Sequence, residues 1–455
     1  MKKSQFILLI AFFLICSCDT SDYLSYDEYY PDYVEQKIKE LNYLSWGDQS
    51  ASDCFIFITD THVKSNIMNS PTIIREILKN TSCTKVIWGG DAIWAYTDNS
   101  SDTPERAREQ ILNQWALQVD SFKHAVVPYG TLYNVRGNHD LTMRILKTDT
   151  SKKENLGYTF DHNFCREKII GDMLSNPKVH YNENDNTCYY YFDENEHKTR
   201  YLICDGQSNP IQSGNIAWGN DFGLGVSQEQ LTWITQEALL TIPDGYNLIV
   251  VIHEGITDIT YPSLYGVYKN FANLLNSFVN KEGQFSCINP GYVVVFSGHM
   301  HMDLQTYKSN VLHIGTASDY LESEINESLL FEPILRGAYS TNEQVMDYVI
   351  LEPEKDMLKC IRIGGGYNRS FHLKKVTLEV DESIILEPDL EAIGYYSYNS
   401  EGHTRKNRQW TIVNDVVSVD NGGRVKGLKA GEAVLFAKDQ SFNKEFYYIE
   451  VKHKQ

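Results

Sequence analysis

Five short motifs in this chain combine carboxylate, amide and imidazole side chains, and each comes directly after an apolar run. Such oxygen and nitrogen donors suit hard or borderline divalent metals, and no motif contains a cysteine thiolate. A single Gly-Asp pair usually marks a turn and a single histidine is usually structural, but five motifs in this order indicate one metal site. The motifs are Asp60-Thr61-His62, Gly89-Gly90-Asp91, Gly137-Asn138-His139-Asp140, His253-Glu254 and Gly298-His299-Met300-His301.

The segments before these motifs predict an α/β core that would bring them together. Residues 54–59 form a continuous apolar run, as expected for a strand buried on both faces. In open α/β sheets ligands gather beyond the carboxyl ends of the strands, so all five motifs can converge on one edge. Further strands are expected at 85–88, 131–135, 189–192, 201–204, 247–252, 292–296, 311–315 and 345–351, and helices at 34–44, 71–79, 104–123 and 227–240.

The motif order D-x-H, G-D, G-N-H-[DE], H and G-H-x-H resembles the calcineurin-like metallophosphoesterase family, and this chain matches every element of it. The resemblance covers roughly residues 52–351. It implies an α/β fold of two mixed sheets packed face to face with helices outside. The implied reaction is hydrolysis of phosphate esters by a hydroxide bound to two divalent metal ions. The motifs leave open whether the substrate is a monoester or a diester.

The resemblance also assigns a role to each motif residue. Asp60, His62 and His301 would bind one metal ion, Asn138, His253 and His299 the other, and Asp91 would bridge the two. His139 would contact the substrate and protonate the leaving group, and Asp140 would hold its imidazole. The expected ions are Mn, Fe, Zn or Ni. Purple acid phosphatases, one branch of the family, carry a tyrosine where this chain has Trp94, which disfavours a ferric-tyrosinate centre. Arg136 is expected to form a surface salt bridge, with phosphate contact as the alternative.

The N-terminus predicts export and lipid anchoring. Lys2 and Lys3 precede a short apolar run, as in a signal peptide, and the run is too short to span a bilayer. The sequence around Cys18 resembles a bacterial lipobox, which implies a signal peptide at 1–17, a lipid on Cys18, and a tether with a short helix at 18–50. The expected location is the bacterial cell envelope, in the outer membrane. The formal charge of −19 argues against nucleic acid as a partner.

The C-terminal region changes to short β-like runs without helices, which predicts a second, smaller β domain. It resembles bacterial immunoglobulin-like group 2 modules, with Trp410 and the run 416–433 carrying the likeness. We therefore expect a phosphoesterase domain at 51–369 and an immunoglobulin-like domain at 370–455. The second domain would be a spacer or a contact surface for glycan or protein. The odd number of cysteines after Cys18 and the lack of C-x-x-C pairs predict core thiols rather than a disulfide framework.

A second hypothesis is a surface binding or adhesion protein whose phosphoesterase-like domain is inactive. Such a protein would be expected to have lost metal ligands. Because every expected ligand is present, the sequence favours the enzyme.

Overall fold

The computed structural model describes most of the chain in segments separated by gaps. The predicted signal peptide and Cys18 lie outside the described residues. Within the predicted tether, the described part is helix α3 (Pro31–Ser45), which confirms the helix expected at 34–44. The described residues are 31–45, 52–62, 69–94, 103–140, 144–149, 152–158, 160, 162–210, 222–260, 265–320, 324–325, 334–336, 340–388, 409–439 and 442–454.

The first three expected strands lie side by side at one end of a ten-stranded mixed sheet. β1 (Asp53–Ile58) lies between β2 (Lys85–Trp88), its parallel neighbour, and β17 (Val345–Glu352), its antiparallel neighbour. The strand at 345–351 therefore returns beside the first strand of the chain. In order across the sheet the strands are β22 (Gln409–Ile412), β25 (Gly431–Lys438), β26 (Lys444–Lys452), β19 (Arg369–His372), β18 (Met357–Gly364), β17, β1, β2 and β3 (Thr131–Asn134), with β20 (Val376–Glu379) paired beside β26.

The other five expected strands belong to a seven-stranded sheet whose central members are parallel. Its order is β13 (Leu304–Lys308), β14 (Val311–Gly315), β12 (Val293–Ser297), β11 (Asn247–Val251), β8 (Thr199–Ile203), β7 (Tyr190–Glu194) and β6 (Val179–Tyr181). Smaller pairs are β4 (Arg144–Asp149) with β5 (Lys152–Tyr158), β9 (Asn209–Pro210) with β10 (Phe222–Gly223), and β15 (Glu324–Ile325) with β16 (Ile334–Leu335).

The two sheets pack face to face through aromatic side chains. Phe55 on β1 meets Tyr201 on β8 and Phe296 on β12 edge-on, with ring centroids 5.6 and 5.3 Å apart. Phe57 contacts the same Phe296 ring at 5.4 Å. Successive strand residues point to opposite faces, so the alternate residues of β1 turn the other way, toward helices. The apolar run is thus buried on both faces, as its composition predicted.

Helices cover the outer faces of both sheets. On the first sheet, Trp88 of β2 stacks on Phe122 of α5 at 4.3 Å. On the second, the helix expected at 227–240 is divided into an α-helical and a π-helical part, and it packs with α8 in one apolar cluster. The helices are α4 (Ser70–Asn80), α5 (Pro104–Val126), α6 (His162–Leu174), α7 (Gln228–Trp233), the π-helix η2 (Ile234–Leu239) and α8 (Tyr265–Val279), with short 3-10 turns η1 (Asn195–His197), η3 (Gly283–Phe285) and η4 (Pro353–Lys355).

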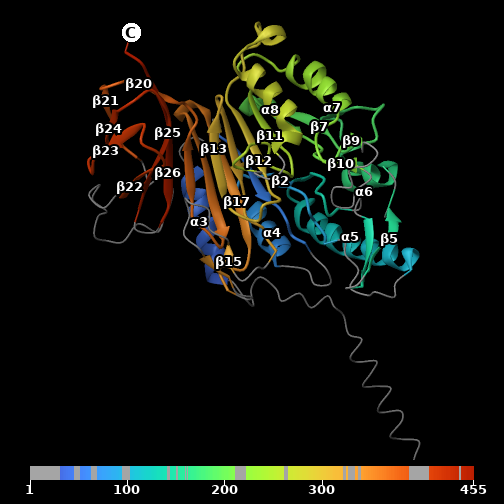
Figure 1. Ribbon diagram of the computed structural model, residues 1–455. Helices are drawn as coiled ribbons and strands as arrows, with labels where there is room; N and C mark the ends of the chain where they lie inside the picture. Colours follow the sequence, from blue (N-terminus) through green and yellow to red (C-terminus); the bar gives the residue numbers. More distant parts are fainter. Residues whose placement is uncertain are drawn as a thin grey trace, which may run out of the picture.

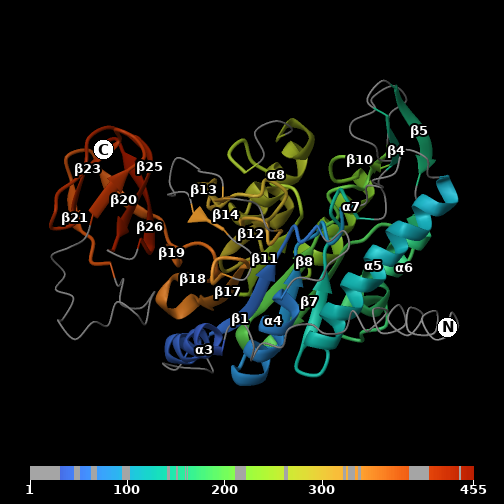
Figure 2. The same cartoon turned by 90° about the horizontal axis from the view of Figure 1, so that it is seen from below.

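The C-terminal strands lie at one end of the molecule, far from α5 and α6 (Figures 1 and 2). They have an apolar cluster of their own, which includes Leu435 and Ile449. β26 nevertheless pairs in parallel with β19, so these strands continue the first sheet. A further three-stranded sheet is formed by β21 (Ser383–Ile385), β24 (Arg424–Gly427) and β23 (Val417–Val419).

The described cysteines, seven in number, are free thiols, and only Cys287 among them is exposed. This agrees with the prediction of core thiols. Among the described helices, none is both long enough and apolar enough to cross a membrane.

The interface between the sheets yields a stability prediction. Phe296→Ala removes the ring that both Phe55 and Phe57 contact, and should lower the free energy of unfolding by about 3–5 kcal/mol. Leu428→Ala, at a side chain that is 48% exposed, should change it by less than about 0.5 kcal/mol. Urea unfolding followed by circular dichroism measures both. Equal losses in the two variants would contradict this account of the core.

Candidate metal centre

The five sequence motifs meet where parallel strands of the two sheets end. The first three motifs follow β1, β2 and β3 of the first sheet, and the last two follow β11 and β12 of the second. The closeness is direct: Nε2 of His62 lies 3.0 Å from Nε2 of His301, although the two residues are 239 positions apart in the chain. The predicted convergence on one edge is therefore present in the folded chain.

Asp60, His62 and His301 form one group whose ligand atoms all lie within 4.8 Å of one another. Oδ1 of Asp60 is 3.3 Å from Nε2 of His301 and 3.7 Å from Nε2 of His62. Asp60 and His62 are fully buried, whereas the His301 side chain is 20% exposed. The group therefore opens to solvent on the His301 side.

Asp91, His253 and His299 form a second group, whose ligand atoms also lie within 4.8 Å of one another. Asn138 joins it, because its Oδ1 lies 3.2 Å from Nε2 of His253 and 2.8 Å from Nδ1 of His299. One carboxylate, one amide oxygen and two imidazoles thus face a common point.

Asp91 lies between the two groups. Its Oδ2 atom is 3.1 Å from Nε2 of His253 and 3.6 Å from Nε2 of His62. Its other oxygen, Oδ1, accepts the backbone N–H of His139 at 2.7 Å. That hydrogen bond leaves Oδ2 directed toward both groups at once.

The spacings within the groups fit the coordination of cations. Donor atoms about 2.1 Å from one ion lie roughly 3.0 Å apart in octahedral and roughly 3.4 Å apart in tetrahedral geometry. The His62–His301, Asp60–His301 and Asp91–His253 spacings of 3.0, 3.3 and 3.1 Å match these values. Oδ1 of Asp60, although buried, accepts no hydrogen bond within the described structure. Such an atom is expected where a cation would complete the site.

Hydrogen bonds around the groups aim the donor atoms inward. Nδ1 of His253 lies 2.8 Å from the Gly89 carbonyl, which can only accept, so Nδ1 carries a proton and Nε2 is the nitrogen that faces the cluster. Oδ2 of Asp60 accepts from the Thr59 hydroxyl at 2.8 Å and from the His299 backbone N–H at 2.9 Å. These contacts leave Oδ1 as the coordinating atom of Asp60.

Five of the ligand residues have left-handed backbone conformations, which are uncommon outside glycine. Such conformations cost roughly 1–3 kcal/mol each and persist only where the surrounding structure fixes them. Their concentration at one place shows that the local chain is shaped for the position of these side chains. The residues and φ values are Asp60 (53°), His62 (46°), Asp91 (53°), His299 (67°) and His301 (56°).

The backbone of Asp60 is fixed from three sides. Its N–H donates to the Gly90 carbonyl at 3.0 Å. Its own carbonyl accepts the Tyr320 N–H at 2.9 Å and the Ser318 hydroxyl at 2.8 Å. The segment 318–320 thus supports the first ligand, although no sequence motif marks it.

Two motif glycines are required because other atoms approach their Cα atoms closely. A Cβ atom at Gly137 would lie 2.2 Å from Oδ1 of Asp91, and one at Gly298 would lie 2.3 Å from Oδ2 of Asp60. Neither contact leaves room for a side chain, so the two carboxylates can reach their positions only past glycine.

The electrostatics of the cluster keep its carboxylates ionised. Burial alone would raise the pKa of Asp60, but the imidazoles of His253 and His301 hold that pKa well below its usual value. Burial would likewise raise the pKa of Asp91, which His253 and His139 hold below the ordinary range. Burial, followed by the nearby His253, lowers the pKa of His299 to about 4. Ionised carboxylates and a neutral imidazole are the forms that bind metal.

Comparison with known families agrees with this geometry. The sequence profile of the calcineurin-like phosphoesterases matches residues 55–303, more than half of the chain. This chain belongs to the calcineurin-like phosphoesterase family. The matched span contains all five motifs, so the two groups are candidate metal-binding residues of a phosphoesterase domain.

Comparison with solved structures gives alignments of low TM-score and low sequence identity. The phosphopantetheinyl hydrolase of Mycobacterium tuberculosis aligns with a TM-score of 0.32 and 11% identity, over 59% of this chain and 91% of that one. Vacuolar protein sorting 29 of Cryptosporidium parvum aligns with a TM-score of 0.24 and 10% identity, over 70% and 95%. Among curated proteins, no match was found.

His139 of the phosphoesterase domain lies beside the two groups without joining either. Its Nδ1 is 3.1 Å from the Trp94 carbonyl, and its Nε2 is 4.0 Å from Oδ2 of Asp91. The ring stacks on the Trp94 indole at 4.9 Å, and the indole also meets the edge of His62 at 4.4 Å. Trp94 therefore lines the site. Burial lowers the pKa of His139.

Asp140 has a different role from the one expected, which was to hold the His139 imidazole. The carbonyl of Trp94 is the partner of that ring nitrogen. The Asp140 carboxylate instead accepts three backbone N–H groups, from Asp91 at 3.0 Å, Ala92 at 2.8 Å and Gly137 at 2.8 Å. It thereby joins the second motif to the third.

Arg136 was expected on the surface, and this expectation was wrong. The side chain is fully buried and forms a two-pronged ion pair with Asp205, with Nε and Nη2 at 2.9 and 2.6 Å from Oδ1. Asp205 also accepts the N–H of Cys188 and is held in turn by Gln230. The Ser227 side chain caps α7 by accepting the Gln230 N–H, and the Gln230 side chain donates to the Asp205 carbonyl.

Arg336 is a supporting residue that sequence reasoning missed. It donates to the carbonyls of Ser318 at 2.9 Å, Tyr320 at 2.7 Å and Asp319 at 3.0 Å, which is the segment that holds the Asp60 backbone. An isolated arginine outside every motif gives no local signal of this role.

The three N–H groups held by Asp140 give a prediction. Asp140→Ala leaves them without their acceptor, and each unsatisfied buried donor costs about 1–3 kcal/mol. We expect the free energy of unfolding to fall by roughly 3–5 kcal/mol, measured by urea denaturation.

Asp420→Ala is the matched control. The exposed Asp420 also accepts two backbone N–H groups, from Gly422 and Arg424, but water can replace it there. Its loss should cost about 1 kcal/mol or less. An Asp140 variant no less stable than the Asp420 variant would show that the carboxylate does not join the two motifs.

Proposed function

We propose that this chain is a metal-dependent phosphoester hydrolase with a dinuclear centre. Asp60, His62 and His301 hold one divalent ion and Asn138, His253 and His299 hold the other. The observation that carries the proposal is the position of Asp91, whose Oδ2 atom faces both groups at 3.1 and 3.6 Å. A shared carboxylate is a suitable bridge because it offsets the repulsion of two neighbouring cations.

The donor set suits Mn, Fe, Zn or Ni. When bound, a pair of such ions lowers the pKa of water and neutralises charge on a phosphoryl group. Trp94, which stands where a tyrosinate ligand would be needed, offers only an indole N–H and no ligand atom.

His139 supplies the proton to the leaving oxygen. Its Nδ1 faces a carbonyl that only accepts, so Nδ1 keeps a proton, and in the imidazolium form the second proton, on Nε2, is the one that passes to the leaving oxygen. Stacking on Trp94 holds the ring in this orientation. A fixed ring places Nε2 beside the substrate without reorganisation during turnover.

The alternative of a surface binding protein with an inactive domain is less well supported. All seven proposed ligands lie at the same place with donor atoms directed inward, and the strained backbone at five of them is maintained. A domain that no longer bound metal would have little to keep such strain in place.

The first experiment uses residues 19–455, stripped of metal and assayed with Mn²⁺, Zn²⁺, Ni²⁺ or Fe²⁺ added back. An aryl phosphate monoester and an aryl phosphate diester are tested in parallel, beside an Asp91→Asn variant. We expect metal-dependent turnover, lost by at least about 10³-fold in the variant because the bridge serves both ions. Full activity in Asp91→Asn would contradict the two-ion reading, and the ratio of the two ester rates identifies the substrate class.

His139→Ala should keep both metal ions but slow turnover by about 10²–10⁴-fold, the usual contribution of a positioned acid. The loss should be largest for substrates with poor leaving groups, which need the proton most. Rates across a series of substituted aryl phosphates, together with metal content, test this. His124→Ala, at an exposed histidine on α5, serves as control. Equal losses across the series would argue against an acid role.

We also propose that the chain is exported to the bacterial cell envelope and anchored in the outer membrane by lipid on Cys18. The residues from 370 onward form an immunoglobulin-like domain that acts as a spacer or contacts glycan or protein. The separate apolar cluster of the C-terminal strands supports the second statement. The anchor rests on the sequence around Cys18.

The anchor is tested by growing expressing bacteria with a radiolabelled fatty acid. The chain should carry the label and sediment with outer membranes, and Cys18→Ala should lose both properties. Cys287→Ala, at the exposed described cysteine, should retain them. Label that persists in Cys18→Ala would exclude Cys18 as the anchor.

A further inference from the structure

Two aspartates and two arginines form a buried cluster close to the metal centre, and the mechanism above does not use it. We call Asp303, Asp347, Arg362 and Arg369 the charge quartet. Each is at most 5% exposed. They lie between the two sheets: Asp303 directly precedes β13 of the second sheet, whereas the other three belong to β17, β18 and β19 of the first.

The contacts inside the charge quartet join all four members. Arg362 donates from Nη2 to Asp303 Oδ1 at 2.6 Å and from Nε to Asp347 Oδ1 at 2.9 Å. Arg369 donates from Nη1 to Asp303 Oδ1 at 3.1 Å and from Nη2 to Asp347 Oδ2. Each arginine thus bridges both aspartates, and the two positive charges balance the two negative ones in a region without water access.

The quartet is coupled to the His301 loop through Asp303, which follows His301 by two residues. Asp303 also accepts the Ala317 N–H at 3.2 Å, and Asp347 accepts the Thr316 hydroxyl at 2.9 Å. Residues 316 and 317 lead into the segment that holds the Asp60 carbonyl. The quartet is therefore linked to His301 through Asp303 and to Asp60 through residues 316 and 317.

A buried ion network is weak evidence for stability, because removing charges from water can cost more than their attraction returns. Its retention needs another reason. We propose that the charge quartet is a positioning device that fixes His301 and Asp60 for the first metal ion, an inference that rests on the metal site proposed above.

The test is titration of metal-free protein with Mn²⁺, followed by calorimetry and electron paramagnetic resonance, with thermal unfolding measured in parallel. Arg369→Met should weaken one of the two Mn²⁺ binding steps by at least about tenfold and leave the other within about threefold. Arg369→Lys should restore part of the affinity, because lysine restores the positive charge but cannot donate to both aspartates as the guanidinium group does. If Arg369→Met does not fold, Asp303→Asn provides the same measurement with a neutral side chain of the same shape.

The control is the ion pair between Arg200 and Asp193, which is also largely buried and two-pronged but lies at the other side of the second sheet. Arg200→Met should lower thermal stability without changing either binding step. Equal weakening in the Arg200 and Arg369 variants, or unchanged Mn²⁺ binding in Arg369→Met, would overturn the positioning role. Absence of Mn²⁺ binding by the unsubstituted chain would instead contradict the proposed function.

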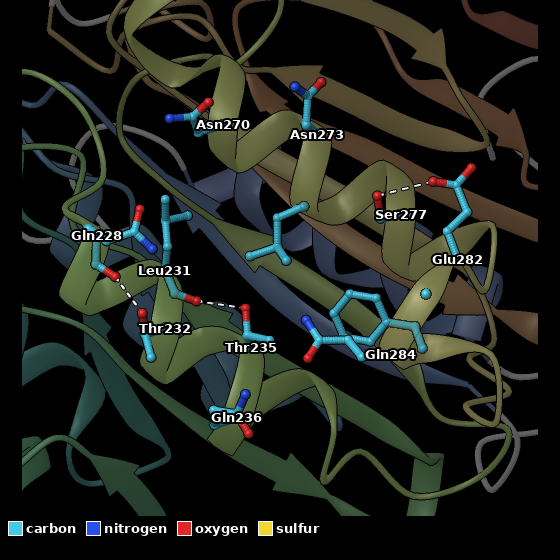
Figure 3. A pocket seen from close by; sticks show the side chains of 13 residues that line it. Gln228, Leu231, Thr232, Thr235, Gln236, Asn270, Asn273, Ser277, Glu282 and Gln284 are labelled. Carbon is cyan, nitrogen blue, oxygen red and sulfur yellow. Dashed lines mark hydrogen bonds between the residues drawn. The ribbon is translucent and has the colours of Figure 1, made fainter.

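A groove on the outer side of the second sheet carries a separate inference. It has a volume of about 670 Å³ and lies between the α7–η2 helix and α8, with the turn η3 at one end (Figure 3). No proposed metal ligand lines it. Five solvent-exposed side-chain amides do. We call it the amide groove, after Gln228, Gln236, Asn270, Asn273 and Gln284.

The lining of the amide groove fits one kind of ligand. Glu282 is its only charged side chain, and it accepts from Ser277, so nothing there attracts an anion. Each amide offers two donors and an acceptor, which matches hydroxyl groups that both donate and accept. Leu231, Leu274 and Phe285 provide an apolar floor for C–H surfaces. The adjoining turn is π-helical, a form that often marks functional sites.

We infer that the amide groove binds a neutral polyhydroxylated ligand of the oligosaccharide class. The probes are maltohexaose, cellohexaose, mannohexaose and chitohexaose, titrated by calorimetry, with a neutral alanine–glycine hexapeptide beside them. At least one sugar should bind, and a Gln236→Ala/Asn273→Ala double variant should weaken it by about tenfold or more, as loss of several hydrogen bonds predicts. Gln409→Ala, at an exposed amide on β22, should leave the affinity unchanged.

Three outcomes would overturn this inference. One is that no sugar binds at millimolar concentration. Another is that a sugar binds but the double variant has the same affinity, which places the sugar elsewhere. The third is that the peptide binds in preference to every sugar, which makes the groove a peptide site.

Discussion

Holding several carboxylates and imidazoles together out of water is the constraint on which this fold depends. Asp60, Asp91 and His253 have almost no exposed surface, yet each must keep one atom available to a cation. Buried polar atoms without partners are costly, so every atom that is not directed at the centre needs a hydrogen bond. The Gly89 carbonyl, the Thr59 hydroxyl and the His139 N–H meet that need. In each of these side chains one atom is directed at the cation and another is hydrogen-bonded, and the residues around the site provide those hydrogen bonds.

The backbone shows the same constraint in another form. Asp60 and His301 have left-handed conformations that glycine would adopt more easily, but glycine has no ligand to offer. The chain therefore places glycines beside the ligands, at Gly137 and Gly298, and ligands in the strained positions themselves. Hydrogen bonds from segment 318–320, which Arg336 holds in turn, keep the Asp60 backbone in this conformation. Rigid support at a metal site limits the reorganisation needed when an ion binds.

Helices α6 and α8 and strands β6, β13 and β18 were not predicted. The sequence was sufficient for the strands that carry the motifs and for the convergence of the motifs on one edge. Those features depend on local patterns: an apolar run, a glycine, then a ligand. The contacts that support the ligands could not be predicted in this way. Arg136 looks like any surface arginine until Asp205, 69 positions away, is seen to pair with it. The family resemblance implied that Asp140 holds the His139 imidazole, whereas the Asp140 carboxylate accepts backbone N–H groups. The sequence also gives no local signal that the helix at 227–240 is divided into α-helical and π-helical parts. Such features are set by long-range packing, which no local pattern encodes.

The pairing of β1 with β17 has a consequence for how the chain folds. Asp53 lies opposite Leu351, so the first sheet cannot close around its first strand until almost 300 further residues are available. Contacts of such long sequence separation form slowly, because the loop between them must lose its entropy before the strands gain their hydrogen bonds. Until then β1, the strand that ends at the first metal ligand, has an open edge that other chains could pair with. The second sheet is made of nearer neighbours and can form earlier. A chaperone that bound the β1 edge would therefore protect the growing chain over the longest interval of its folding.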